Sequence, residues 1–315
     1  MYDAYSKGIS YSRAFWILMG LWLAGFIVGG IVSIPIWILM TGKGLSSMQQ
    51  EMLNPENVNA VRVIQVVSTA LTFFLPAFIT AFLINRRPGK ILGLTMRFEY
   101  RQLLMVIAIM LAAAVVAASL ATFTEWIPIS KSATAYFKEM EENYVSQVEV
   151  MANMNAFGDY LISMVMIALL PAFFEETFFR GGMQNFLTRI LRKPGAAILI
   201  TSIIFSLVHI SYYGFLARLC LGVVLGLIFY YAKSLWLSII AHFFNNAIAV
   251  TQMYVLMKRG KSVREAMNDN YPIWWGMIAT LVLYGLFIIF KKYSAKAVKE
   301  FTEPEDRALE ERWIA

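Results

Sequence analysis

The sequence predicts an all-α membrane protein, a polytopic bundle of about eight transmembrane helices, on three observations. Hydrophobic residues make up 59% of the 315 residues, whereas a soluble domain is nearer 45–50% apolar. The apolar residues are gathered into eight runs of about 20 residues, the length that crosses a hydrocarbon core of roughly 30 Å. Most charged residues lie between these runs or at their ends.

The first three spans are expected at 14–40, 61–84 and 102–123. The chain opens with the polar stretch MYDAYSKGISYSR, and the apolar run after it is too long for the core of a cleaved signal peptide. We therefore expect the first span to remain as a membrane anchor.

The long loop at 124–157 contains a helical pattern of apolar residues at three- and four-residue steps. This spacing predicts an amphipathic helix resting on the outer membrane surface or on the bundle. A connector and a lid over the bundle both fit the pattern. The residues that carry it are Phe137, Met140, Tyr144, Val148 and Met151.

Five further spans are expected at 158–180, 196–212, 215–232, 235–257 and 272–290. The fifth and sixth are short and share the turn SYYG, so a single broken hairpin is an alternative that lowers the count by one. The chain is predicted to be one transmembrane domain over 1–315, with catalytic core helices at 155–250 and a polar cytosolic tail at 291–315.

Charge predicts the orientation and argues against a nucleic-acid partner. With both termini inside the cell, 18 of the 27 basic residues fall on cytosolic segments and 7 on outer loops, as expected when short basic loops stay cytosolic. The net charge of +7 is therefore explained by an N-in, C-in topology. Cys220 is the single cysteine, which excludes intrachain disulfides.

A few ionisable side chains lie inside the predicted spans, where they are costly and are candidates for function. The fourth span holds three of them, and the fifth and seventh each hold one histidine. These residues are Glu175, Glu176, Arg180, His209 and His242.

Their spacing separates the two glutamates. Glu176 and Arg180 are four residues apart, share a helix face and can pair. A carboxylate paired with an arginine stays ionised and carries protons poorly, so we predict that this pair is structural. Glu175 points about 100° away and is predicted to be available for chemistry.

The seventh span places His242 and Asn246 on one face, four residues apart, where both can donate hydrogen bonds to a developing oxyanion. In the fifth span Phe205 and His209 share a face, and His209 could orient a water beside Glu175. The heights match if the fourth helix continues past 181–182 to about 192. The site would then lie on the order of 10 Å inside the cytosolic face.

The motifs Glu-Glu-x-x-x-Arg, Phe-x-x-x-His and His-x-x-x-Asn occur in this order on successive spans. Together they resemble the CAAX-protease and bacteriocin-processing family, the family of the Rce1-type prenyl proteases, over about 155–250. The resemblance implies that Glu175 is the catalytic glutamate, with His209, His242 and Asn246 in the other polar roles. Glu176 and Arg180 complete the first motif.

The leading interpretation is an intramembrane endopeptidase that cleaves a membrane-associated or prenylated-type protein or peptide with water activated by glutamate and histidine. We expect no cofactor and a multi-pass location in the bacterial cytoplasmic membrane. The sequence has no His-Glu-x-x-His zinc motif, no Gly-x-Ser-Gly motif and no pair of intramembrane aspartates.

Two alternatives remain open at this point. Glu175, His209 and His242 could instead hold zinc as two histidines and one carboxylate, which would make the protein a metalloprotease with the same residues. A membrane scaffold or immunity protein could also carry the polar cluster without being an enzyme.

Overall fold

The structure, a computed structural model, describes residues 6–95, 98–151, 153–261 and 272–301. The regular elements of these ranges are helices, and seven of them are long and apolar enough to cross a membrane. The all-α prediction is therefore confirmed, and a polytopic membrane bundle is consistent with it.

The first two long helices form a closely packed hairpin. Helix α1 (Tyr11–Thr41) is capped by Ser10, whose side chain accepts a hydrogen bond from the backbone N–H of Arg13. Its partner is a continuous helix built from η2 (Pro55–Asn57), α3 (Val58–Thr69), the π-helical η3 (Ala70–Phe74) and α4 (Leu75–Ile84). Gly25 allows the close approach, since a Cβ there would lie 2.2 Å from the carbonyl oxygen of Leu71.

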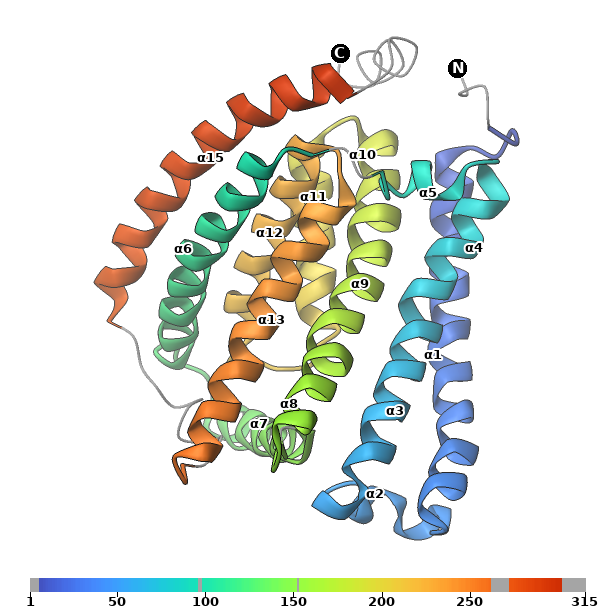
Figure 1. Ribbon diagram of the computed structural model, residues 1–315, viewed down its shortest axis with the longest axis vertical. Coiled ribbons are helices and arrows are strands. Elements are labelled where there is room, and N and C mark those ends of the chain that lie inside the picture. The colour runs from blue at the N-terminus through green and yellow to red at the C-terminus, as the bar shows by residue number, and fades with distance from the viewer. Residues whose placement is uncertain (1–5, 96–97, 152, 262–271, 302–315) are drawn as a thin grey trace.

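The next helices are α5 (Pro88–Ile91), α6 (Tyr100–Glu125) and α7 (Lys131–Met151). Helix α7 confirms the helix predicted within the loop 124–157. It lies across one end of the bundle (Figure 1), and Val145 and Val150 are its buried residues.

The fourth predicted span is part of a much longer helix, Phe157–Leu191. It consists of α8 (Phe157–Ser163), α9 (Leu170–Glu176) and α10 (Asn185–Leu191), joined by the π-helical segments η4 (Met164–Leu169) and η5 (Thr177–Gln184). The predicted continuation past 181–182 is confirmed, and the helix ends at Arg192, whose φ is 53°.

The fifth predicted span, 196–212, is wrong in its length. Helix α11 (Pro194–Leu207) has 14 residues, which reach only about 21 Å. A turn follows, and α12 (Phe215–Ala232) returns along α11, with which it packs. The two helices thus form the short hairpin that was the alternative prediction.

Two long helices complete the fold, α13 (Leu235–Lys258) and α15 (Ile273–Phe301). Helix α15 packs on α6 and extends eleven residues beyond the predicted end at 290, into the predicted tail. The remainder of that tail, 302–315, lies outside the described residues.

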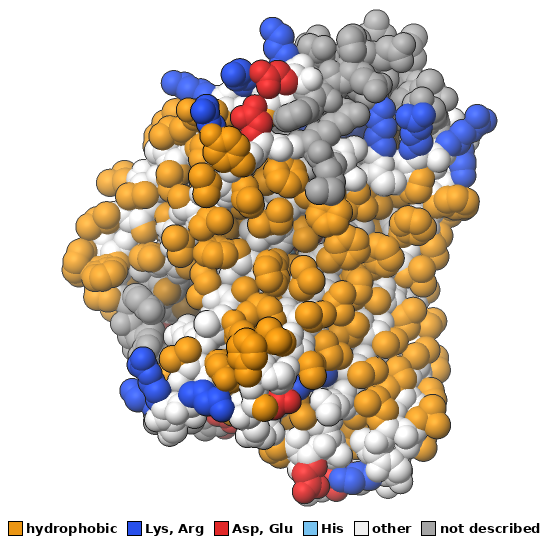
Figure 2. All heavy atoms as spheres, viewed as in Figure 1, with side chains coloured by type: hydrophobic (Ala, Val, Ile, Leu, Met, Phe, Trp, Pro, Cys, Tyr) orange, Lys and Arg blue, Asp and Glu red, His pale blue; other side chains and the backbone are white. Residues whose placement is uncertain are grey.

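The arrangement fits a bilayer. Helix α1 begins and α15 ends at the same end of the bundle, opposite α7 (Figure 1). Hydrophobic side chains cover the middle of the face shown in Figure 2, whereas most of its charged side chains gather toward the two ends. These features indicate a multi-pass membrane protein, and the N-in, C-in orientation stays a prediction.

A buried arginine joins the first hairpin to the rest of the bundle. Arg62 of α3 is 1% exposed. Its guanidinium donates hydrogen bonds to the carbonyls of Met151 (2.8 Å) and Asn153 (3.1 Å) and to the hydroxyl of Ser163 (2.9 Å). Met151 is the last residue of α7, Asn153 lies between α7 and α8, and Ser163 is the last residue of α8. One side chain of α3 therefore holds the end of α7 and the end of α8.

Arg62→Met should therefore destabilise the whole bundle. Each buried acceptor left without a donor costs about 1–3 kcal/mol, so the midpoint of thermal unfolding of the purified protein should fall by several degrees. Arg101→Met is the matched control, because Arg101 is exposed and, within the described ranges, donates a hydrogen bond only to the hydroxyl of the neighbouring Tyr100. Equal midpoints for the two variants would contradict this role of Arg62.

Candidate active site

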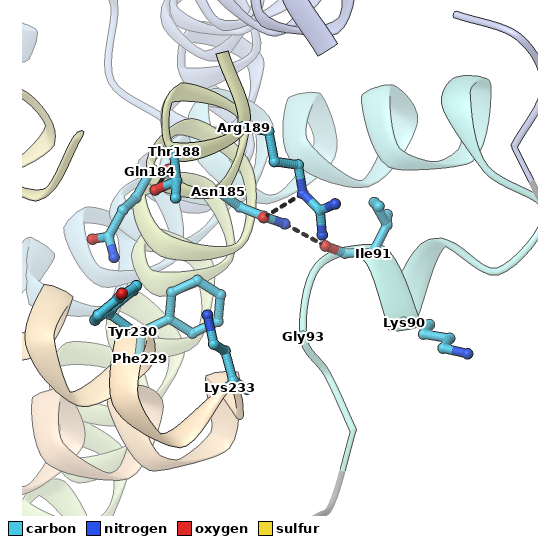
Figure 3. Close-up of a pocket in the computed structure, with 10 residues that line it drawn as sticks. All are labelled: Lys90, Ile91, Gly93, Gln184, Asn185, Thr188, Arg189, Phe229, Tyr230 and Lys233. Atoms are coloured by element: carbon cyan, nitrogen blue, oxygen red, sulfur yellow. Dashed lines mark hydrogen bonds between the residues drawn. The ribbon is translucent and has the colours of Figure 1, made fainter. Parts of the chain in front are cut away.

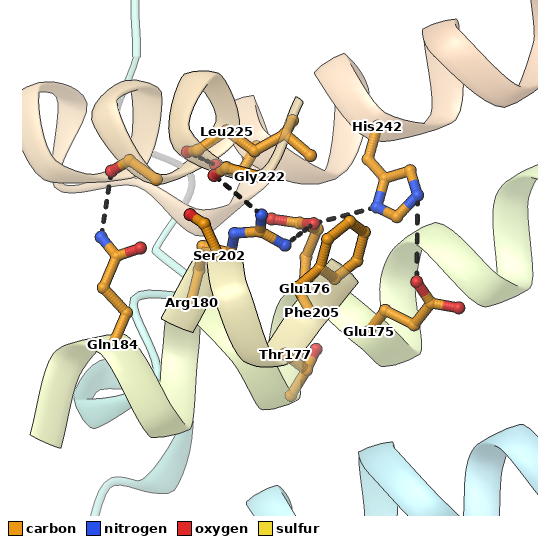
Figure 4. Close-up of polar contacts among 12 residues, drawn as sticks. Glu175, Glu176, Thr177, Arg180, Gln184, Ser202, Phe205, Gly222, Leu225 and His242 are labelled. Atoms are coloured by element: carbon orange, nitrogen blue, oxygen red, sulfur yellow. Dashed lines mark hydrogen bonds and ion pairs between the residues drawn. The ribbon is translucent and has the colours of Figure 1, made fainter. Parts of the chain in front are cut away.

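The predicted site residues meet where α9, η5, α11 and α13 pack together (Figure 4). Glu175 and Glu176 are the last two residues of α9, and Arg180 lies in η5. Phe205 lies near the end of α11, and His242 lies in the second turn of α13. Figure 4 shows these side chains converging on one small volume between the helices.

The predicted pair between Glu176 and Arg180 is confirmed. One guanidinium nitrogen lies 2.6 Å from the Glu176 carboxylate, and both side chains are 0% exposed. A second guanidinium nitrogen donates to the carbonyl of Gly222 in α12 at 3.0 Å. The guanidinium also lies 4.8 Å from the ring centroid of Phe205, so Arg180 ties η5 to two further helices.

His242 lies beside Glu175, as the sequence predicted, and also contacts Glu176, which the sequence did not predict. Its Nδ1 lies 2.9 Å from the Oε1 of Glu176, and its Nε2 lies 4.0 Å from the Oε2 of Glu175. An ionised carboxylate only accepts hydrogen bonds, so Nδ1 carries the proton and donates it to Glu176. Nε2 then faces Glu175, as an acceptor in the neutral ring or as a donor in the imidazolium.

Glu175 differs from its neighbour in its surroundings. Its side chain is 14% exposed, and among the described residues no hydrogen bond reaches its carboxylate. The side chain of Glu176, by contrast, is fully buried and contacts both Arg180 and His242. The two adjacent carboxylates are therefore distinct, as the helix phase predicted.

Phe205 brings the two histidines together. Its ring centroid lies 4.9 Å from that of His209 and 5.9 Å from that of His242. The Nδ1 of His209 lies 2.8 Å from the Phe205 carbonyl oxygen, which can only accept, so this nitrogen also carries its proton. The Nε2 of His209 is then the nitrogen able to accept a proton from a water.

Asn246 lies one helical turn beyond His242 on the same uninterrupted helix, α13. Its side-chain oxygen is 3.4 Å from the amide nitrogen of Asn245. The amide nitrogen of Asn246 is a donor that this bond does not use. The shared helix face of His242 and Asn246 agrees with the prediction, whereas the role of Asn246 stays a prediction.

Helix α7 holds the turn that carries His209, a contact that sequence reasoning missed. Glu141 accepts a hydrogen bond from the Ser211 hydroxyl at 2.8 Å, and the ring of Phe137 stacks on Tyr212 with centroids 4.5 Å apart. Between His209 and Ser211, Ile210 has a φ of 49°, which is rare for a β-branched residue. The helical pattern in the sequence revealed α7 but not which turn it covers.

The residues do not fit the zinc site that was left open above. In the part of the chain that the structure describes, no three side chains of His, Cys, Asp or Glu are placed to hold a metal ion. Glu175, His209 and His242 surround the site, but the three do not converge as a ligand set among the described residues.

Glu176→Gln should destabilise the protein more than Glu175→Gln. The first substitution leaves Arg180 as a buried cation without its carboxylate, a change that costs about 3–5 kcal/mol. The second alters a partly exposed group that makes no hydrogen bond in the described structure. Thermal unfolding in the same detergent measures the difference, and a midpoint for Glu176→Gln equal to that of Glu175→Gln would refute the structural role of Glu176.

Comparison with known proteins agrees with the resemblance seen in the sequence. Residues 157–248 match the family described as type II CAAX prenyl endopeptidase Rce1-like. No match was found among the curated proteins or among the solved structures. The matched segment begins at α8, ends within α13 and contains every site residue that the sequence predicted, but not the residues of α7. By this match residues 157–248 of the chain are similar to the Rce1-like type II CAAX prenyl endopeptidases, a family of peptidases.

Proposed function

We propose that the protein is an intramembrane endopeptidase in which Glu175 activates a water that attacks a peptide bond of a membrane-associated or prenylated-type substrate. The family implies a peptidase of this kind. The observation that carries the residue assignment is the contrast between two neighbouring carboxylates. Glu176 is buried against Arg180 and His242, while Glu175 is partly exposed and faces the Nε2 of His242.

In this mechanism Glu175 takes a proton from the water as the water oxygen attacks the carbonyl carbon. The carbonyl becomes an oxyanion, and Glu175 returns the proton to the leaving amine when the carbon–nitrogen bond breaks. His209 helps to hold the water, because its Nε2 can accept a hydrogen bond from it. Atoms balance with one water consumed, one new carboxyl formed and one new amine released.

The oxyanion needs donors, and the two candidates differ. The amide nitrogen of Asn246 can donate at any pH. His242 already donates from Nδ1 to Glu176, so its Nε2 donates to the oxyanion only when the ring is an imidazolium. We assign the oxyanion to both, with Glu176 holding the ring of His242 in the required orientation.

The apolar surroundings support a membrane-associated substrate. Phe74 of η3 packs against Phe173 and Phe174, which precede Glu175, with ring centroids 5.5 Å and 5.7 Å apart. These rings place hydrophobic side chains directly beside the reacting carboxylate. A substrate segment with apolar or lipid-modified residues would find favourable contacts there.

Glu175→Gln should abolish proteolysis and leave the protein folded, because a carboxamide cannot take the proton from water. Asn246→Ala should slow turnover about 10²–10³-fold, the usual cost of removing one oxyanion donor. Both are measured by following the new protein termini that form over time in membranes incubated with purified enzyme.

Glu139→Gln is the matched control, since it removes an exposed carboxylate of α7 that lies about 200° around the helix from Glu141. It should keep the wild-type rate. Full activity in Glu175→Gln would overturn the assignment of the base. The same termini appearing with every variant and without enzyme would show that another protease makes them.

A further inference from the structure

One face of α7 contacts the turn between α11 and α12, residues 208–214, which carries His209. Three side chains of α7, spaced four and three residues apart, lie on this face. Each contacts a residue of the turn or of the first turn of α12: Phe137 contacts Tyr212, Glu141 contacts Ser211, and Tyr144 contacts Arg218. The proposed reaction assigns no role to these six residues.

The Ser211 side chain joins α7 to the backbone of the turn. Ser211 is buried. Its hydroxyl donates a hydrogen bond to Glu141 at 2.8 Å and accepts one from the backbone N–H of Gly214 at 3.1 Å. The carboxylate of Glu141 therefore holds a side chain that itself shapes the turn, two residues after His209.

The backbone between His209 and Ser211 is strained. Ile210 has a φ of 49°, which is unfavourable for a β-branched residue. Such a conformation persists only where the surrounding structure fixes it. On one side the backbone N–H of Ile210 donates to the carbonyl of Leu207 at 3.0 Å. On the other side the contacts with α7 begin at the next residue, so α7 is placed to fix this conformation.

Close packing does not support the turn on the side that faces α7. A cavity of about 740 Å³ lies between the end of α6, α7 and the turn, and Glu141, Gly214 and Arg218 are among the residues that line it. Within the described part of the chain, the turn faces open space there. Packing against neighbouring side chains would therefore not replace the hydrogen bond of Glu141 if it were lost.

A second cavity, at the end of the bundle where α1 begins, offers a comparison. It has a volume of about 110 Å³ and lies between α5, α10 and the end of α12 (Figure 3). The side chain of Asn185 joins two of its walls by donating to the carbonyl of Ile91 at 2.6 Å. This bond stabilises the bundle far from the turn, so Asn185 provides a control for a purely structural hydrogen bond beside a cavity.

The position of the turn decides which nitrogen of His209 can accept. Nδ1 donates to the carbonyl of Phe205 at 2.8 Å, which leaves Nε2 as the acceptor. In a neutral imidazole, the hydrogen bonds of the two nitrogens set which of them carries the proton. If the turn moved, the bond to Phe205 would be lost, the proton could pass to Nε2, and Nε2 would no longer accept from a water.

We propose that Glu141 is a positioning residue that holds His209, through Ser211, in the orientation and tautomer that proteolysis requires. The proposal rests on the proposed function, in which His209 holds the attacking water. Helix α7 lies outside residues 157–248, the segment that matches the peptidase family. A helix outside that segment would therefore complete the active site of this chain.

The first test is nuclear magnetic resonance of the full chain labelled with ¹⁵N-histidine, in detergent at mildly alkaline pH. The chain has two histidines, His209 and His242, and His209→Gln assigns their ring signals. Wild-type His209 should show the Nδ1–H tautomer. Glu141→Leu should convert the His209 signals partly or wholly to the Nε2–H tautomer and leave those of His242 unchanged. Ser211→Ala removes the same hydrogen bond by a smaller change and should have the same effect.

The second test is the rate of cleavage of a fluorogenic peptide that spans the cleavage site identified from the new protein termini. Glu141→Leu should lower kcat about tenfold with little change in KM, the size expected for one hydrogen bond to a charged group. Glu141→Gln keeps an oxygen that accepts from Ser211, and it should restore the wild-type rate and spectrum.

Two controls separate positioning from general destabilisation. Glu139→Leu changes an exposed position of the same helix and should leave the rate and the His209 signals as in the wild type. Asn185→Leu should lower the midpoint of thermal unfolding, because it removes the bond to Ile91, but it should leave the His209 signals unchanged.

Unchanged His209 signals in Glu141→Leu and Ser211→Ala would overturn the proposal. The same shift of His209 in Asn185→Leu, or equal changes of His209 and His242 in both turn variants, would also overturn it, because general loss of structure would then explain the result. A Glu141→Gln variant as slow as Glu141→Leu would exclude the hydrogen bond as the cause. Full activity of Glu175→Gln would instead refute the proposed function, whereas the spectra test Glu141 without any protease assay.

Discussion

The fully buried ion pair between Glu176 and Arg180 is the interaction on which the site depends. Two charges removed from water are costly unless they are paired and their remaining hydrogen-bonding groups are used. Arg180 meets part of this condition by a second bond to the Gly222 carbonyl, and Glu176 by a bond from His242. The Nε of Arg180 and the Oε2 of Glu176 are buried without a hydrogen-bond partner among the described residues. The pair therefore fixes η5 against α12 and α13 at once, and it sets the orientation of the His242 ring.

The buried ion pair gives the adjacent residues Glu175 and Glu176 different chemical roles. Once Glu176 is turned into the interior to meet Arg180, Glu175 must point about 100° away around the helix. That direction carries it to the Nε2 side of His242 and leaves it partly exposed. Full burial keeps the Glu176 carboxylate in its ion pair with Arg180, whereas partial exposure lets the Glu175 carboxylate exchange a proton with water.

The surrounding helices bring the remaining groups to the same height. Gly181 packs against Leu235. Gly181 follows Glu175 by six residues and Leu235 precedes His242 by seven, so about 9–11 Å of helix separates each side chain from that contact. Helix α11 is too short to cross the bundle, and for that reason its end, with Phe205 and His209, stays inside the protein beside Glu175. The early end of α11 thus places Phe205 and His209 at the site.

Local spacing in the sequence was enough to predict the pairing of Glu176 with Arg180, the shared face of His242 and Asn246, and the continuation of the fourth helix. Contacts between helices could not be predicted, because spacing gives no distance from one helix to another. Three such contacts between helices were not predicted: the bond from His242 to Glu176, the hydrogen bonds of Arg62, and the contact of α7 with the turn at Ser211. The length of α11 was missed because the apolar run continues to Ile210, beyond the helix end at Leu207.

The most direct test of the account is a single turnover in ¹⁸O-labelled water, with the enzyme in excess over a peptide substrate that it cleaves. Mass spectrometry then measures ¹⁸O in the product and in the enzyme segment that contains Glu175 and Glu176. If Glu175 acts on water as a base, the new carboxyl carries ¹⁸O after the first turnover and both glutamates remain unlabelled. Label in Glu175, with unlabelled product, would mean that the carboxylate itself attacks the peptide bond and would contradict the account.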